Sequence, residues 1–448
     1  MNTLNNKSDI ITALATPYGK SAVAIIRISG DGCINLLNSF LEKPLKVGRL
    51  GVNTFRSGNF TENLMAVAYK SPKSYTGEDL VELFPHGNML ICDIIIKQLI
   101  DGGARLAERG EFTKRAFING KLDMMQCEAL ADIIDAQTPE QLDYGNNRYF
   151  GRFKALETVQ QLLKSSLSSI EAVLHYGDEL EQNEIDGAAV NQIIAAVDEA
   201  IGLLTKEVNG FAGGKIIKDG FKIALIGAPN VGKSTLLNAL TDSDRAIVTP
   251  IAGTTRDTVD GEYVYNGRKF IVTDTAGLNA DTADQVEKIG IERAKKAAEQ
   301  ADAVLFVSDD QTDISEIAHL NGFIRQVRVK NKCDGEKDVE TDYKTAYDDA
   351  KTLKISAKNG VNITALKQLL YDLCPKDFGS ICNHRQYECV RRCLDSLTVV
   401  KSEAKKAEGL EVVAALLYEA YSEILSLYGE QADESVISAV FDRFCVGK

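Results

Sequence analysis

The stretch Gly227–Ser234, Gly-Ala-Pro-Asn-Val-Gly-Lys-Ser, has the pattern of a phosphate-binding loop: Gly, four residues, and then Gly-Lys-Ser/Thr. Glycines allow the backbone to wrap around a polyphosphate, so that several N–H groups and a helix N-terminus point at it. Lys233 would reach the β- and γ-phosphates, and the Ser234 hydroxyl would ligate Mg²⁺. Apolar runs on both sides predict the strand and the helix that this motif needs, at Phe221–Ile226 and Thr235–Leu240.

Four more stretches follow the loop in the order that a guanine-nucleotide switch requires. The first is Gly253–Asp257, Gly-Thr-Thr-Arg-Asp, in which Thr255 has an oxygen that can complete the Mg²⁺ shell and sense the γ-phosphate. The second is Asp274–Gly277, Asp-Thr-Ala-Gly, which ends a predicted strand. Its carboxylate can hold a metal-bound water, and its last N–H group can meet the γ-phosphate.

The other two stretches address the base. Asn331–Asp334, Asn-Lys-Cys-Asp, ends another predicted strand, and Asp334 can accept from the guanine N1–H and N2–H₂ groups. Adenine does not offer these groups in that arrangement, and leaving the carboxylate unpaired is costly, so the pairing discriminates strongly between the bases. Ser356–Lys358, Ser-Ala-Lys, would cover the edge of the base. Five motifs in this order predict a GTPase.

The group that positions the attacking water is not fixed by these motifs. Leu278 stands where Ras-type switches have a glutamine, and an apolar side chain cannot orient a water molecule. Asn230 and the loop Thr249–Thr254 add oxygens near the phosphates and could hold a monovalent cation where an arginine finger would otherwise act. Three acids could position the water, and spacing alone does not choose among Asp281, Asp284 and Glu287.

The composition is that of a globular protein of 448 residues, 44% hydrophobic and 26% charged, and this length predicts two or three domains. The net charge of −13 argues against a general basic surface for nucleic acid. Residues 1–120 carry 14 Lys/Arg and 11 Asp/Glu, a balance of +3, so any RNA contact should be local. The sequence contains neither a run of the ~20 apolar residues needed to cross a membrane nor a secretion signal. Both observations predict a cytoplasmic location.

Nine cysteines, at positions 33, 92, 127, 333, 374, 382, 389, 393 and 445, are dispersed without a Cys-x-x-Cys pair. An odd, scattered set in a large cytosolic chain predicts free thiols rather than a disulfide framework. His384, Cys389 and Cys393 form a helical arrangement without a second cysteine pair, so their spacing does not suit zinc.

Residues 1–120 mix short apolar runs with turns and predict an α+β domain. Ala22–Ile28 and Leu64–Tyr69 predict strands, and Met89–Leu99 predicts a helix. Arg27 stands inside the first of these strands. It could occupy an edge position with its head in solvent, or it could be a buried guanidinium for a carboxylate or phosphate ligand. The strand pattern alone favours the edge position.

From Leu122 to about Val208 the apolar spacing is helical, and Asn209–Gly214 predicts a flexible boundary. Residues 215–374 then alternate strands and helices, as in a parallel sheet covered on both faces. The expected strands are Lys222–Ile226, Lys269–Thr273, Ala303–Val307, Gln326–Lys330 and Thr352–Ile355. Helices return afterwards, at His384–Ala407, Leu410–Leu427 and Glu434–Phe444. We therefore expect an α/β unit inserted into a helical domain.

Further motifs run along the whole chain, at Ile11–Pro17, Ile26–Gly30, Ser74–Asp79, Gly110–Phe117, Asn119–Asp123, Ala246–Thr249, Gly253–Asp257, Val286–Arg293 and Phe444–Lys448. On these residues the chain resembles the tRNA modification GTPases of the MnmE (TrmE) family. The terminal Phe-Cys-Val-Gly-Lys is decisive, because other GTPases lack it. The resemblance implies a multidomain α/β and α fold. It comprises an α+β N-terminal domain for tetrahydrofolate binding and dimerisation (1–120), a helical domain (121–212 and 375–448) and an inserted P-loop, Ras-like α/β G domain (213–374).

The resemblance also implies roles for individual residues near the phosphates. Mg²⁺ falls to Ser234 and Thr255, and the positions that match the family's K⁺ ligands are Asn230, Thr249, Ile251 and Thr254. Glu287 matches the family's water-positioning acid. The implied catalytic residues are Glu287, Lys233, Arg256, Asp257 and Cys445, of which the cysteine either touches the chemistry or only shapes the site. The implied nucleotide-binding residues are Asn230, Val231, Gly232, Lys233, Ser234, Thr235, Thr249, Pro250, Ile251, Ala252, Gly253, Thr254, Thr255, Asp274, Thr275, Ala276, Gly277, Asn331, Lys332, Cys333, Asp334, Ser356, Ala357 and Lys358.

Positions that match the family's site for 5-formyl- or 5,10-methylene-tetrahydrofolate are Arg27, Glu82, Lys121 and Lys448. This resemblance favours the ligand-binding interpretation of Arg27. The chain departs from the family at His86-Gly-Asn88, where the family has His-Gly-Gly, and at Asn279, where it usually has Arg. The loop Leu278–Glu287 is one residue longer than in the family.

The implied function is a GTP-hydrolysing enzyme that forms a heterotetramer with MnmG, a partner that uses FAD and NADH. Together they would add an aminomethyl- or carboxymethylaminomethyl-type group to C5 of the wobble uridine, position 34, of certain tRNAs, using a tetrahydrofolate one-carbon unit. The resemblance implies a homodimer whose G domains meet in a K⁺-dependent manner, away from membranes. The alternative is a ribosome-assembly GTPase of the Era or Der type, but the tail after Pro375 lacks a basic RNA-binding module.

Overall fold

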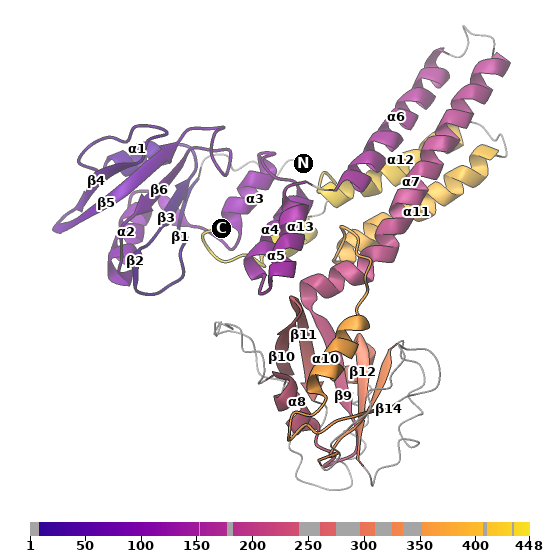
Figure 1. The fold of residues 1–448 in the computed structure, drawn as a ribbon. Coiled ribbons are helices and arrows are strands. Elements are labelled where there is room, and N and C mark those ends of the chain that lie inside the picture. Colours follow the sequence, from indigo (N-terminus) through magenta and orange to yellow (C-terminus); the bar gives the residue numbers. More distant parts are fainter. Residues whose placement is uncertain are drawn as a thin grey trace. The chain divides into compact units, whose positions relative to one another are not determined.

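The structure is a computed structural model, whose helices and strands are drawn in Figure 1. It describes residues 9–151, 153–176, 182–241, 260–274, 296–309, 325–334, 352–405, 410–431 and 434–448. The chain divides into two compact units. Unit 1 contains Met1–Ala131, Arg148–Gly151 and Tyr421–Lys448, and unit 2 contains Asp132–Asn147 and Arg152–Ala420. Unit 1 is therefore assembled from segments that are distant in the sequence, whereas unit 2 is nearly continuous.

Unit 1 is built on a six-stranded sheet with the order β4-β5-β6-β3-β1-β8. Its strands are β1 (Ile10–Leu14), β3 (Ile26–Ser29), β4 (Gly51–Ser57), β5 (Phe60–Tyr69), β6 (Leu80–Phe84) and β8 (Ala104–Leu106). Alternate strand residues are buried against α1 (Cys33–Asn38) and α2 (Met89–Asp101) on one face. The expected strand at Leu64–Tyr69 and the expected helix at Met89–Leu99 are confirmed as parts of β5 and α2.

The apolar run Ala22–Ile28, expected as one strand, is interrupted. Its first part forms β2 (Ser21–Val23), which pairs with β7 (His86–Gly87) in a separate two-stranded sheet, and β3 starts only afterwards. Gly87 permits this second pairing, because a Cβ added there would lie 2.2 Å from Ser21 Oγ. The strand is interrupted because its first part pairs with β7. The pattern of apolar residues indicates burial and not backbone pairing, so it does not predict this interruption.

A layer of helices in unit 1 brings the two ends of the chain together. α3 (Glu111–Ile118), α4 (Met124–Asp135) and α13 (Glu434–Phe441) contribute to one apolar core. α3 begins after Gly110, which has φ 64° and lies so close to α13 that an added Cβ would be 2.5 Å from the Phe441 carbonyl oxygen. The last helix therefore packs against the first domain. The helix expected at 434–444 is confirmed as α13.

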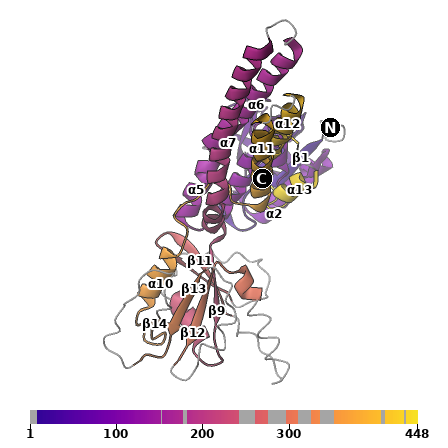
Figure 2. The same cartoon turned by 90° about the vertical axis from the view of Figure 1, so that its right-hand side faces the viewer.

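The helical part of the chain contains α5 (Pro139–Tyr149), α6 (Lys154–Tyr176), α7 (Gln182–Asp219), α11 (His384–Lys405) and α12 (Leu410–Tyr428). α6 lies along α7, and α11 lies along α7 as well, as Figures 1 and 2 show. Because α7 precedes and α11 follows the nucleotide motifs, the insertion expected from the sequence is confirmed. In the ranges that the structure describes, no helix has the length and apolar character needed to span a membrane.

The stretch Asn209–Gly214, expected as a flexible boundary, lies inside α7, so that prediction is wrong. Its glycines allow close packing rather than flexibility. A Cβ added at Gly210 would lie 2.2 Å from the Gly379 nitrogen, and one added at Gly213 would lie 2.2 Å from the Asp377 carbonyl oxygen. The chain that leaves the α/β part therefore runs against α7 at a distance that no side chain allows.

The nucleotide motifs lie on a second six-stranded sheet, with the order β10-β11-β9-β12-β13-β14 and only β10 antiparallel. α8 (Lys233–Thr241) and α10 (Ile363–Asp372) pack on one face, and the helical residues around Ala298 pack on the other. The expected α/β fold and its five strands are confirmed, and β10 adds a hairpin. The strands are β9 (Phe221–Ile226), β10 (Asp260–Tyr265), β11 (Arg268–Asp274), β12 (Ala303–Ser308), β13 (Gln326–Lys330) and β14 (Thr352–Lys354).

β11 connects the helical part of unit 2 to the phosphate loop. Its first residue, Arg268, donates from Nε to the Glu140 carboxylate of α5 at 3.0 Å and lies over the Tyr371 ring at 5.5 Å. Its last residue, Asp274, accepts from the Ser234 hydroxyl at 2.7 Å. A single strand thus contacts the helical domain at one end and the nucleotide motifs at the other.

Candidate functional site

The phosphate loop Gly227–Ser234 connects the end of β9 to α8, as the motif requires. Gly227 packs closely on β12, since an added Cβ would lie 2.2 Å from the Val307 carbonyl oxygen. Asn230 and Gly232 have positive φ angles of 63° and 93°, which produce the tight turn of the loop. The glycines of the motif therefore serve both close packing and an unusual backbone conformation.

Lys233 stands at the start of α8 and is only 5% exposed. Its ammonium donates to the carbonyl oxygens of Gly227 at 2.7 Å and Ala228 at 2.8 Å. Burial lowers the pKa of Lys233, and the negative charge of Asp274 offsets part of this shift. The structure thus keeps a cation within the loop, where it can pair with the phosphates of a nucleotide.

Ser234 and Asp274 meet although they come from different motifs. Ser234 Oγ donates to Asp274 Oδ2 at 2.7 Å, and Asp274 is 4% exposed. Hydroxyl and carboxylate oxygens are the hard ligands that suit Mg²⁺. The two side chains that the sequence predicts on the metal side of the phosphates are therefore neighbours.

Asn331 links the base-recognition loops to the phosphate loop. Its Nδ2 donates to the Val231 carbonyl at 3.0 Å, and its Oδ1 accepts from the Ala357 N–H at 3.0 Å. Ser356 Oγ in turn donates to Asp334, so both base motifs are held together. The structure brings these predicted residues to the same edge of the sheet, beyond the carboxyl ends of β9, β13 and β14.

Several predicted residues lie outside the described part of the chain, and their roles stay predictions. This holds for most of the K⁺ set, for the second Mg²⁺ ligand and for the water-positioning acid. They are Thr249, Pro250, Ile251, Ala252, Gly253, Thr254, Thr255, Arg256, Asp257, Thr275, Ala276, Gly277 and Glu287.

Arg27 lies on β3, an interior strand between β6 and β1, so the edge position that the strand pattern favours is wrong. Its guanidinium donates to Glu82 Oε1 from Nε at 3.0 Å and from Nη2 at 2.8 Å. Nη1 donates to the Gly447 carbonyl at 3.1 Å. The side chains of Arg27 and Glu82 are only 18% and 19% exposed. A largely desolvated ion pair therefore reaches from the central sheet to the C-terminal tail.

The tail Phe444–Lys448 is held in unit 1 through its backbone. Val446 forms an antiparallel bridge with Arg109. Gly447 has φ 98°, and a Cβ added there would lie 2.3 Å from the Leu14 carbonyl oxygen. Only glycine fits this position, because both the conformation and the space exclude a side chain.

The other residues of the predicted folate site differ in their placement. Lys448 follows Gly447, whose carbonyl accepts from Arg27, and burial together with repulsion by the Arg27 charge lowers the pKa of Lys448. Cys445 is exposed. Lys121 is exposed as well, but its ammonium donates to the Pro72 carbonyl at 3.1 Å rather than to this pair.

All nine cysteines lie in the described ranges, and none forms a disulfide, so the prediction of free thiols is confirmed. Eight of them are buried. In the same ranges, no group of three or more His, Cys, Asp and Glu side chains is arranged to hold a metal ion.

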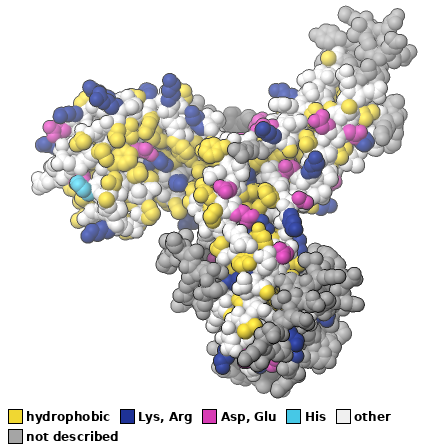
Figure 3. Space-filling view, in the orientation of Figure 1, with side chains coloured by type: hydrophobic (Ala, Val, Ile, Leu, Met, Phe, Trp, Pro, Cys, Tyr) yellow, Lys and Arg dark blue, Asp and Glu magenta, His cyan; other side chains and the backbone are white. Residues whose placement is uncertain are grey.

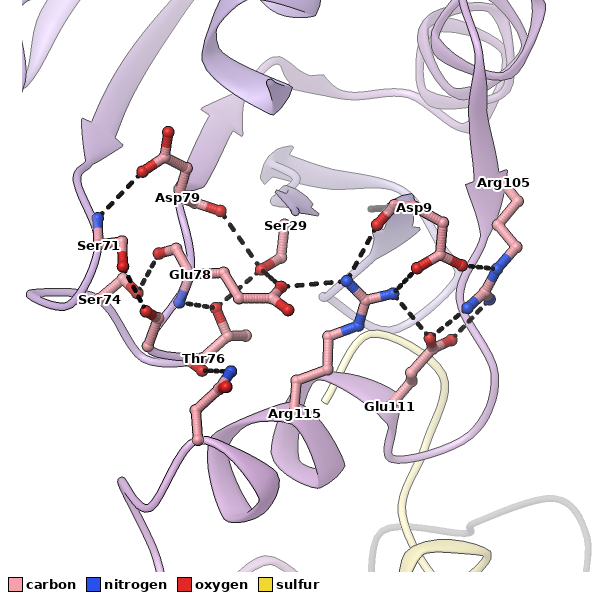
Figure 4. A network of polar contacts seen from close by, with 12 residues as sticks. Asp9, Ser29, Ser71, Ser74, Thr76, Glu78, Asp79, Arg105, Glu111 and Arg115 are labelled. Carbon is pink, nitrogen blue, oxygen red and sulfur yellow. Dashed lines mark hydrogen bonds and ion pairs between the residues drawn. The ribbon is translucent and has the colours of Figure 1, made fainter. Parts of the chain in front are cut away.

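A network of charged side chains, not predicted from the sequence, joins the start of β1, the loop after β5, and α3 (Figure 4). Arg115 donates to Glu78 at 3.0 Å and to Glu111 at 3.1 Å. Asp9 accepts from Arg115 at 2.8 Å and from Arg105 at 2.6 Å. Arg105 also donates to Glu111 at 2.5 Å. Two guanidinium groups thus bridge three carboxylates.

The same network fixes the loop beside Arg27. Ser29 Oγ lies 2.7 Å from Thr76 Oγ1 and donates to Glu78 at 2.9 Å. Asn119 Nδ2 donates to the Thr76 carbonyl at 2.7 Å. The motifs Ser74–Asp79 and Gly110–Phe117 are therefore partners in space. The polar and charged residues of these two motifs are the sequence signal from which the network could have been predicted.

Asn88, which departs from the family's His-Gly-Gly, has a local structural role. It is the N-cap of α2, and its side chain accepts from the Leu90 N–H at 2.9 Å. Asparagine is among the preferred residues at this position, since it satisfies a backbone donor that the helix leaves unpaired.

A P-loop, an aspartate at the end of the neighbouring strand, and an Asn-Lys-x-Asp motif tied to the loop define a protein of the P-loop GTPase class. Two family models match the chain: "GTP-binding protein TrmE N-terminus" over residues 10–121 and "MnmE helical domain" over residues 124–445. The second model spans the inserted G domain. The chain therefore belongs to the MnmE (TrmE) family of tRNA modification GTPases.

Individual relatives agree with this assignment. The tRNA modification GTPase MnmE of Thermotoga petrophila is 36% identical over 455 residues, covering 98% of this chain and 100% of the relative. The protein of the same name from Aquifex aeolicus is 34% identical over 451 residues, covering 98% and 99%. Among solved structures, the FeoB G-domain from Methanococcus jannaschii is 30% identical, covers 34% of this chain and 97% of that chain, and has a TM-score of 0.25.

The charged network predicts a defined loss of stability in acid. Burial raises the pKa values of Asp9 and Glu111, but hydrogen bonds and charges from Arg105 and Arg115 outweigh burial and lower them below the ordinary values of 3.8 and 4.5. Such carboxylates stabilise the fold fully above the unfolded-state values and lose this contribution as pH falls through the folded-state values.

We therefore expect the unfolding temperature of unit 1 to fall with pH below about 4.5, the ordinary value for Glu111. The double variant Asp9→Asn, Glu111→Gln should unfold at a lower temperature near neutral pH and show a shallower acid dependence. Calorimetry over this pH range checks both expectations. Equally steep acid dependences in the variant and the natural chain would contradict them.

Proposed function

We propose that this chain, together with a MnmG partner that uses FAD and NADH, modifies C5 of the wobble uridine of certain tRNAs. GTP hydrolysis would drive a cycle in which an aminomethyl- or carboxymethylaminomethyl-type group is added with a carbon from 5,10-methylene-tetrahydrofolate. The observation that carries the proposal is the contact between Arg27 and Gly447. It joins a predicted ligand-binding arginine to the tail that distinguishes this family from other GTPases. A tRNA substrate also favours a cytoplasmic location.

The residues around Arg27 fit a tetrahydrofolate ligand. Arg27 uses three of its five N–H groups within the chain, so two donors are left for a ligand. Oε2 of Glu82 has no hydrogen-bond partner in the described ranges. A pterin has donors and acceptors on one edge, which a neighbouring donor and acceptor can match. Lys121 and Lys448 would add positive charge for the ligand's carboxylates. When bound, the folate supplies the one-carbon unit.

At the nucleotide site, Lys233 and the loop N–H groups would hold the phosphates, while Asp334 would select guanine. Mg²⁺ would be held by Ser234 and Thr255, and K⁺ by Asn230, Thr249, Ile251 and Thr254. Glu287 would orient the attacking water, and Arg256 and Asp257, which follow Thr255 in the sequence, would be further catalytic residues. The hydrogen bond between Ser234 and Asp274 supports the metal assignment, because it gathers oxygen ligands at the loop.

Unit 1 offers a surface for a second copy of the chain. Val52, Met65 and Phe84 are paired in register across β4, β5 and β6, on the sheet face opposite α1 and α2. Val52 is 78% exposed and Met65 is 38% exposed. Hydrophobic side chains gather over unit 1 in Figure 3, and exposed apolar surface of this kind marks interaction sites. This supports a homodimer formed by the N-terminal domains, within which the G domains would meet.

We place the N-terminal domain at 1–120, the two parts of the helical domain at 121–212 and 375–448, and the G domain at 213–374. With these limits the G domain starts within the last turns of α7, which continue to Asp219. Cys445 would either take part in the modification chemistry or shape the folate site. Its exposure next to the fixed tail is compatible with both roles.

The cation assignment predicts that GTP turnover is severalfold faster in KCl than in NaCl at equal ionic strength. Glu287→Ala should abolish hydrolysis and spare GTP binding, because the carboxylate would act on the water rather than on the nucleotide. Asp284→Ala, which removes an acid from the same loop, is the matched control and should retain turnover. Equal rates in the two salts would contradict the K⁺ assignment, and turnover by Glu287→Ala would contradict the role of that acid.

The modification role predicts a change in cellular tRNA. Nucleosides from a strain without this gene should lack the wobble-uridine modification, and the natural gene should restore it. Arg27→Ala should fail to restore it, while Arg56→Ala, an exposed arginine of the same domain, should succeed. Mass spectrometry of tRNA nucleosides gives the answer. An unchanged nucleoside profile in the deletion strain would favour a ribosome-assembly GTPase of the Era or Der type.

A further inference from the structure

The guanidinium of Arg27 has aromatic as well as polar partners. Its central carbon lies over the Tyr75 ring at 5.5 Å and over the Phe112 ring at 5.6 Å from the ring centres. Both distances are within the range of a cation–π interaction, which strengthens when the cation is desolvated. Arg27 meets that condition, because its side chain is only 18% exposed.

The two rings are themselves held by α3. Phe112 is a fully buried residue of that helix. The Tyr75 hydroxyl lies 2.8 Å from Oγ1 of Thr113, which is fully buried on the same helix. α3 is fixed in turn by the ion pairs of Arg115. The rings are therefore connected through α3 to the charged network of Arg115.

These contacts restrict how the guanidinium can turn. A guanidinium is planar, and its donors form a rigid fork whose direction decides which ligand atoms it can reach. Glu82 and Gly447 take three of the five N–H groups, one on each nitrogen of the fork. The rings hold the plane, so the remaining N–H groups on Nη1 and Nη2 keep a fixed direction before a ligand arrives. Pre-organisation of this kind lowers the cost of binding.

We propose that Tyr75, supported by Thr113 and Phe112, is a positioning residue that orients Arg27 for its folate ligand. This inference rests on the proposed tetrahydrofolate site. Tyr75 affects ligand binding by orienting Arg27 and not by contacting the ligand itself.

The test measures binding of 5-formyl-tetrahydrofolate to the full chain by calorimetry. Tyr75→Leu removes the ring and should weaken binding about tenfold, which corresponds to about 1.4 kcal/mol. Tyr75→Phe keeps the ring and should bind within about threefold of the natural chain, a difference of at most about 0.7 kcal/mol. Tyr18→Leu, in the same domain, is the matched control because this exposed tyrosine contacts Asp93 and not Arg27. GTP turnover and unfolding temperature verify that each variant folds.

A double-mutant cycle with Arg27→Lys separates positioning from a merely structural role. If Tyr75 acts through the guanidinium, Tyr75→Leu should weaken binding by less than about twofold in the Arg27→Lys background, since the planar fork is already lost. Additive losses, or a Tyr75→Leu chain that binds like the natural one, would overturn the inference. If the natural chain does not bind the folate at all, the proposed function fails and the inference fails with it.

Discussion

A guanidinium largely withdrawn from water must be paired, and the partners of Arg27 join the first domain to the C-terminal tail. Glu82 on the neighbouring strand supplies the charge, and the Gly447 carbonyl supplies a further acceptor from a residue 420 positions away. The last residues must therefore return to the first domain. Gly110 and Gly447, both with positive φ, allow the backbone of the tail to approach the domain closely enough.

The rest of the molecule is inserted between these two ends. α7 and α11 lie side by side and carry the chain out to the α/β sheet and back, and the glycines of α7 let the returning segment pack against it. β11 then spans from the Arg268–Glu140 contact to the Asp274–Ser234 contact. One strand therefore carries a contact to the helical domain at one end and a contact to the phosphate loop at the other.

Four of the five nucleotide motifs could be located from the sequence, because each is short and follows a strand with a clear apolar pattern. Lys233, Ser234, Asp274 and Asn331 are placed as expected. The environment of Arg27 could not be predicted from local pattern, since an interior strand with one charge looks like an edge strand until its distant partners are known. Family resemblance alone pointed to the burial of Arg27.

The role of a glycine-rich stretch was also not predictable from the sequence. A flexible linker and a site of close backbone packing have the same residue pattern. Asn209–Gly214 resembles a flexible linker, yet these glycines lie in a helix and serve close packing. The charged network of Arg105 and Arg115 was also not predicted, because its carboxylates come from three separate segments. Contacts of this kind depend on the tertiary fold and not on the spacing of residues.

The central claim is that the tail completes the folate site through its contact with Arg27. Affinity for 5-formyl-tetrahydrofolate in Gly447→Ala and Gly58→Ala tests it most directly. Both glycines have positive φ, but only at Gly447 would the added Cβ collide, with Leu14, whereas Gly58 has open space. Gly447→Ala should bind at least about tenfold more weakly, or about 1.4 kcal/mol, while Gly58→Ala should bind like the natural chain. Unchanged affinity in Gly447→Ala would contradict the account.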